Sequence, residues 1–164
     1  MPPLFYRVDD YPDEINAAGI LVRLIDGLGF RFFWATDGLG ESDYDYAPEQ
    51  GGNSLGWMVA HIWGLTNWVR INLTGERASR PRSIPEQRDH VLEMLCGLRE
   101  HFSRLSAIEL SRIKIEGYPF WHMINGPIAD ALTHVGQINY ARRLAGAPVS
   151  TANVFTCDPP EDPI

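Results

Sequence analysis

Two residues near the C-terminal end of the chain have types and spacing suited to binding a metal ion. Asp130 and His134 lie four residues apart in a stretch with helical periodicity, so their carboxylate and imidazole share one face of a helix. The same face carries small and polar side chains, with apolar side chains beside it, and this pattern favours a cavity wall over a dry core. The polar stripe comprises Gly126, Asp130, His134, Gln137 and Ala141, and the apolar stripe comprises Ile124, Ile128, Ala131, Val135 and Ile138.

A third candidate ligand, His61, lies in the middle of an earlier helical stretch. Its neighbours at helical spacing are Trp57, Gly64, Leu65 and Trp68, which predicts that the imidazole faces inward among large apolar groups. Burying an imidazole without a polar partner is costly. A metal ion shared with the pair on a facing helix would satisfy it, as in many bundle cores.

Spacing alone leaves two simpler interpretations open. His61 is also compatible with a hydrogen-bonded histidine in the core. Asp130 and His134 are also compatible with an ion pair on a helix surface, which contributes only a few tenths of a kcal/mol.

Three further residues are candidates for the surroundings of the site. Gln137 is placed to orient a ligand or a bound water, although a hydrogen bond between helices explains it equally well. Trp57 is the tryptophan best placed to line a pocket, and His122 is a candidate for the mouth of the cavity.

The residues that position these side chains fall into four long segments with helical periodicity, and we find no convincing alternating strand pattern. The predicted helices span about 13–33, 54–74, 84–106 and 125–145. The first is predicted to bury one face, formed by Ile15, Ile20, Leu24, Ile25, Leu28 and Phe32.

Start and stop signals delimit the other three helices. Asn53 or Ser54 can cap the second helix, and Gly75 suits its left-handed end. Ser83 and Glu86 have the spacing of a capping box at the start of the third. For the fourth, we expect Pro127 in the first turn, arginines near the end and a terminating glycine, namely Arg142, Arg143 and Gly146.

The sequence therefore predicts an all-α protein, a four-helix bundle with long crossover loops that forms a single domain over residues 1–164. The two long connections run from Thr36 to Gly52 and from Ala107 to Phe120, and loops of this length permit crossovers. The proline-rich segment 147–164 is predicted to be an extended C-terminal tail.

Composition excludes several classes of function. With 14 basic and 21 acidic residues the formal net charge is -7, which disfavours the phosphate contacts that dominate nucleic-acid affinity. The sequence has no apolar run of the roughly 20 residues that a membrane span requires and no signal-peptide pattern. We therefore expect no nucleic-acid or membrane partner, and a cytoplasmic location. Cys96 and Cys157 form neither a disulfide framework nor a thiolate metal motif.

Two stretches resemble a known family of metal-dependent bundles. These are NSLGWMVAHIWGLTNWV around His61 and NGPIADALTHVGQINYARRLAG from Asn125 to Gly146. Together they are similar to the DinB/YfiT-like superfamily of four-helix bundles. The most specific part is the His-x-Gly-Gln run from His134 to Gln137, followed by the arginine-containing helix end.

The resemblance implies a metal site in which one ligand comes from the second helix and two come from the last. These ligands fall on His61, Asp130 and His134. The commoner family arrangement has a third histidine where this chain has Asp130. Two imidazoles and one carboxylate still form a competent set for Zn or Ni, and for Fe or Mn.

Two functions follow from the resemblance. The first is a metal-dependent thiol transferase or isomerase, or a hydrolase, that acts on a small electrophile, with a low-molecular-weight thiol as partner and the metal activating the thiol or water. The second is a non-catalytic small-molecule-binding or stress-associated bundle protein with a structural or vestigial metal site. A third interpretation is a helical scaffold whose polar stripe forms a dimer contact, and homodimerisation is compatible with all three.

Overall fold

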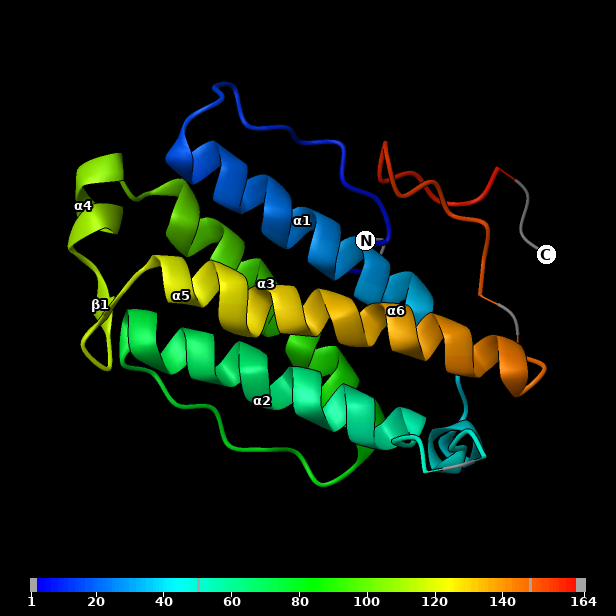
Figure 1. Cartoon of the computed structure of the whole chain (residues 1–164). Helices are drawn as coiled ribbons and strands as arrows, with labels where there is room; N and C mark the ends of the chain where they lie inside the picture. The colour runs from blue at the N-terminus through cyan, green and yellow to red at the C-terminus, as the bar shows by residue number, and fades with distance from the viewer. Residues whose placement is uncertain (1–2, 50, 148, 162–164) are drawn as a thin grey trace.

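The computed structural model describes residues 3–49, 51–147 and 149–161. As predicted, the chain is mainly helical, and the long helices are α1 (Ala17–Thr36), α2 (Leu55–Thr74), α3 (Ile84–Ser103) and α6 (Ala129–Leu144). Both α1 and α2 pack against α3 and against α6, and Figure 1 shows α6 in front of these two helices and α3 behind them. In the described part of the chain, no helix combines the length and apolarity that a membrane crossing requires.

The predicted caps of α2 and α3 are confirmed. The side chain of Ser54 accepts a hydrogen bond from the backbone N–H of Trp57, and Gly75 ends α2 in the left-handed region with φ of 75°, where a glycine meets no Cβ penalty. Ser83 and Glu86 form the expected capping box of α3. Local sequence therefore fixes the position of α2, which carries His61.

Helix α1 begins later than predicted, and its buried face agrees with the prediction only in part. The side chain of Asn16 caps it by accepting from the N–H of Gly19, so Ile15 lies outside the helix and is 97% exposed, and Ile20 is also exposed. The prediction that both belong to the buried face was wrong. The predicted Ile25, Leu28 and Phe32 are buried, and Leu21 and Val22 complete the inward face.

The last helix begins earlier than the predicted residue 125. The short helix α5 (Trp121–Met123) continues into a π-helical turn, η2 (Ile124–Ile128), which leads into α6 with helical backbone angles at the junctions. Pro127 therefore lies inside the helix, not in its first turn. Because proline has no N–H to donate, the regular i to i-4 ladder cannot pass through it, and a π turn accommodates the gap.

The end of α6 agrees with the prediction. Gly146 has φ of 76°, and the N–H groups of Gly146 and Ala147 donate to the carbonyls of Arg143 and Arg142. Arg142 has a longer reach than expected, because its buried guanidinium donates to the carbonyls of Ala35 and Asp37 at the end of α1. One arginine thus joins the ends of two helices.

The connections contain more regular structure than predicted. A 3-10 helix, η1 (Glu41–Asp45), lies in the first. Because Ser106 caps a separate helix, α4 (Ala107–Arg112), α3 ends at Ser103 and not at 106. A small hairpin of β1 (Lys114–Ile115) and β2 (Tyr118–Pro119) follows α4.

The C-terminal segment packs beside the N-terminal one. The N–H of Val8 donates to the carbonyl of Cys157, and the Cys157 side chain is buried. Of the predicted tail 147–164, positions 148 and 162–164 lie outside the described residues.

Candidate metal centre

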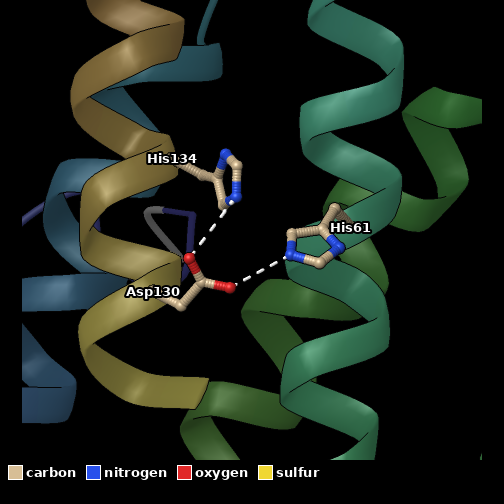
Figure 2. Close-up of side chains that lie close together, drawn as sticks. All are labelled: His61, Asp130 and His134. Atoms are coloured by element: carbon tan, nitrogen blue, oxygen red, sulfur yellow. Dashed lines mark hydrogen bonds and ion pairs between the residues drawn. The ribbon is translucent and has the colours of Figure 1, made fainter. Parts of the chain in front are cut away.

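Two facing helices bring the three predicted ligands together. Asp130 and His134 project from α6 one turn apart, and His61 projects from the middle of α2 toward them. Figure 2 shows the Asp130 carboxylate between the two imidazoles. Because α2 and α6 pack directly against each other, the distance between these side chains is set by the helix interface.

The ligand atoms are close enough to share one ion. The Nε2 atom of His61 is 3.1 Å from Oδ2 of Asp130, and Nε2 of His134 is 3.5 Å from Oδ1. One ligand atom from each residue lies within 4.8 Å of the others. Ligands at roughly 2.0–2.2 Å from a tetrahedral Zn ion are separated by about 3.3–3.5 Å, so only small side-chain movements are needed to enclose a first-row divalent ion.

Gln137 contacts the far side of one candidate ligand. Its Oε1 atom is 2.7 Å from Nδ1 of His134. In the tautomer in which Nδ1–H donates to this oxygen, Nε2 carries the lone pair that a metal ligand needs, and it faces Asp130. The donor set therefore fits a metal ion, with Gln137 orienting one ligand.

The carboxylate has no basic partner to neutralise it. Among the described residues, the ion-pair contacts of Asp130 are with His61 and His134 alone. A divalent ion would satisfy both carboxylate oxygens and both imidazoles together. The donor chemistry is compatible with Zn, Ni, Fe or Mn.

The centre is accessible from one side. The side chains of Asp130, His61 and His134 are 45%, 33% and 11% exposed. A shallow groove of about 650 Å³ adjoins it, within the usual range of small-molecule sites. Its lining includes Trp57, His61, Leu65, Trp68, Arg80 and Pro127.

Trp57 holds both imidazoles in place and lines the groove. Its ring stacks on His61 with centroids 4.9 Å apart and planes 11° apart, and it meets His134 edge-on at 5.7 Å. The predicted neighbours of His61 are therefore present. However, they line an open groove and do not form a closed core, so the imidazole of His61 is partly exposed.

His122 lies elsewhere. Its ring is exposed and packs against Tyr118 of the hairpin, 5.0 Å between centroids. It is not among the residues that line the groove or form the ligand group.

Sequence reasoning missed two groove residues, Arg80 and Pro127. Arg80 belongs to the connection between α2 and α3, which has no periodicity to indicate its direction. Pro127 was assigned to a helix start, whereas the structure places it inside a π turn, a feature often found at functional sites.

None of three comparisons, with protein-family models, with curated proteins and with solved structures, found a match for this chain. The similarity to the DinB/YfiT-like superfamily therefore stays a prediction from the sequence motifs.

Proposed function

We propose that this chain is a four-helix bundle of the DinB/YfiT-like type that binds a divalent metal ion through His61, Asp130 and His134 and uses it to transfer or rearrange a low-molecular-weight thiol on a small electrophile. The main support is the juxtaposition of this donor set with an open groove. A purely structural Zn site is normally closed by four protein ligands. Here, among the described residues, three candidates converge and the group is partly exposed.

Different residues of the chain have different roles in this proposal. A divalent metal in such a site lowers the pKa of a thiol or water that binds to it, which produces a nucleophile near neutral pH. Gln137 keeps the Nε2 atom of His134 available as a ligand, and Trp57 fixes the ring plane of His61 by stacking. The groove beside them offers a surface for the electrophile.

The test is whether a thiol can reach the metal. The protein is stripped with a chelator, loaded with Co²⁺ as a spectroscopic probe, and titrated with 2-mercaptoethanol while its absorption is recorded. We expect a saturable sulfur-to-cobalt charge-transfer band in the wild type. Ethanol serves as the control ligand and should give no such band.

The matched variants are His61→Ala and His122→Ala, because both remove a histidine but only the first removes a proposed ligand. The band should disappear in His61→Ala and persist in His122→Ala. A cobalt spectrum that does not respond to the thiol would rule out the thiol-dependent function, even if the metal itself is bound.

A further inference from the structure

The groove beside the proposed metal centre combines an aromatic wall with a single cationic side chain. Trp57, Leu65 and Trp68 supply the apolar surface from α2, Pro127 contributes from η2, and Arg80 comes from the connection after α2. Trp57 is 45% exposed, so its ring is accessible from the groove. The groove therefore has one apolar region and one positive end.

Arg80 is held in position but not neutralised. Its Nε donates to Oε1 of Gln87 at 3.3 Å, and its guanidinium lies 5.7 Å from the ring centroid of Trp63. Within the described ranges, no carboxylate lies at ion-pair distance from Arg80, and both of its terminal nitrogens are free of hydrogen bonds. A guanidinium arranged in this way can bind a carboxylate through two parallel N–H donors.

A second groove on the molecule serves as a comparison, because the arginines that line it are already paired. It lies along α3 and is also lined by arginines, but these already pair with neighbouring glutamates, Arg70 with Glu76 and Arg104 with Glu100. The groove at the metal centre thus differs in presenting an unpaired cation in a chain whose net charge is -7.

From this arrangement we propose that the groove binds an amphipathic carboxylate, with its aryl or alkyl body on Trp57 and Trp68 and its carboxylate on Arg80. The inference rests on the proposed function in one respect, since it identifies this molecule as the electrophilic substrate presented to the metal centre. Binding itself depends on the groove and not on the ion.

Gly64 provides a way to block the groove without disturbing the fold. It lies on α2 one turn after His61, lines the groove, and a Cβ at this position would meet nothing within 4 Å. Gly64→Leu therefore places a side chain in the groove. Gly97→Leu is the matched control, because Gly97 also lies on a long helix, also has open space around it, and lines the other groove.

The probes are 4-phenylbutyrate and its neutral amide, titrated calorimetrically into chelator-treated protein and into the same protein loaded with Zn²⁺. We expect the carboxylate to bind wild type at least ~10-fold more tightly than the amide, as for one charge-assisted contact, in both forms. Arg80→Gln should reduce the carboxylate to the affinity of the amide, Gly64→Leu should abolish binding of both probes, and Gly97→Leu should change neither.

Equal affinities for acid and amide would overturn the proposal. So would carboxylate binding that is lost with the metal but unaffected by Arg80→Gln, because the carboxylate would then be a metal ligand. Failure of the metal site itself is recognised separately, as wild-type protein that retains no Zn²⁺, and leaves the measurement on chelator-treated protein decisive.

Discussion

Two aspartates on neighbouring helices of this protein have opposite surroundings. Asp26 on α1 is fully buried, and Arg99 of α3 donates to it through Nε at 2.6 Å. Asp130 on α6 is 45% exposed, and its neighbours are imidazoles, which are themselves metal ligands. Asp26 thus pairs with arginines of the chain, whereas among the described residues Asp130 has ion-pair contacts only with histidines.

The Asp26 cluster acts as a structural connection. Arg99 also donates to the backbone carbonyl and the side chain of Asp10, which connects the N-terminal segment to α3. Burial raises the pKa of Asp26, although Arg99 opposes the shift. A buried carboxylate paired with an internal guanidinium supports the fold, whereas a partly exposed carboxylate between imidazoles is suited to a ligand.

The largest expected effect comes from removing the partner of Asp26. Arg99→Met removes the hydrogen-bonded partner of a buried carboxylate and leaves only Arg23, whose Nη1 atom lies 3.9 Å from Oδ2 of Asp26. Loss of one member of a buried pair costs about 3–5 kcal/mol. We expect the free energy of unfolding in urea to fall by about 3 kcal/mol, since Arg99 itself is partly exposed. Arg104→Met, which breaks an exposed pair on the same helix, should cost less than about 1 kcal/mol. Similar losses of unfolding free energy in the two variants would contradict the structural role assigned to the buried Asp26 pair.

The next effect is on metal affinity without a change in stability. Gln137→Leu removes the acceptor that orients His134, and loss of such a partner typically lowers metal affinity about 10–100-fold. Competition with a chromophoric chelator measures the change, and urea unfolding of the metal-free variant should match the wild type. If Gln137→Leu binds Zn²⁺ as tightly as the wild type, the assigned role of Gln137 is wrong.

A smaller effect concerns the pH dependence contributed by Asp26. The pKa of Asp26 in the folded state is raised above the ordinary value of 3.8. At pH values between the unfolded and the folded pKa, the folded state therefore binds more protons than the unfolded state. Its contribution to stability is therefore largest in acid and is lost as pH rises through the folded pKa. The stability difference between wild type and Asp26→Asn should fall from pH 4 toward neutrality, by no more than about 1.4 kcal/mol per pH unit. A difference that grows over this range would show that pairing with Arg99 outweighs burial.

The smallest effect is expected at the other aspartate. Asp130→Asn in metal-free protein removes an exposed carboxylate that no guanidinium neutralises, so the free energy of unfolding should change by less than about 0.5 kcal/mol. A loss as large as that of Arg99→Met would mean that Asp130 supports the fold and not a ligand.

The predictability of these two clusters from sequence differs for a physical reason. Asp130 and His134 are linked by local helical geometry, and the caps at Ser54 and Gly75 placed His61 on a long helix. Asp26 and Arg99 are separated by 73 residues and carry no local signal of their pairing. The position of Arg80 likewise depends on how a connection packs against α3, through Gln87 and Trp63.

Helix boundaries were likewise predicted correctly where the sequence signal is local. Side-chain caps and terminal glycines are local, and they correctly predicted both ends of α2. The start of α1 was missed although Asn16 is of a type that commonly caps helices. The π turn was missed because a proline near a helix start is normally assigned to the first turn.

The most direct test of the account is the metal content of the protein after incubation with Zn²⁺ and Ni²⁺ and exhaustive dialysis, measured by mass spectrometry. Wild type and Asp26→Asn should retain about one ion per chain, whereas His61→Ala and Asp130→Ala should retain almost none, because removing one of three ligands abolishes tight binding. Wild-type protein without metal, or equal retention in Asp130→Ala, would contradict the proposed centre.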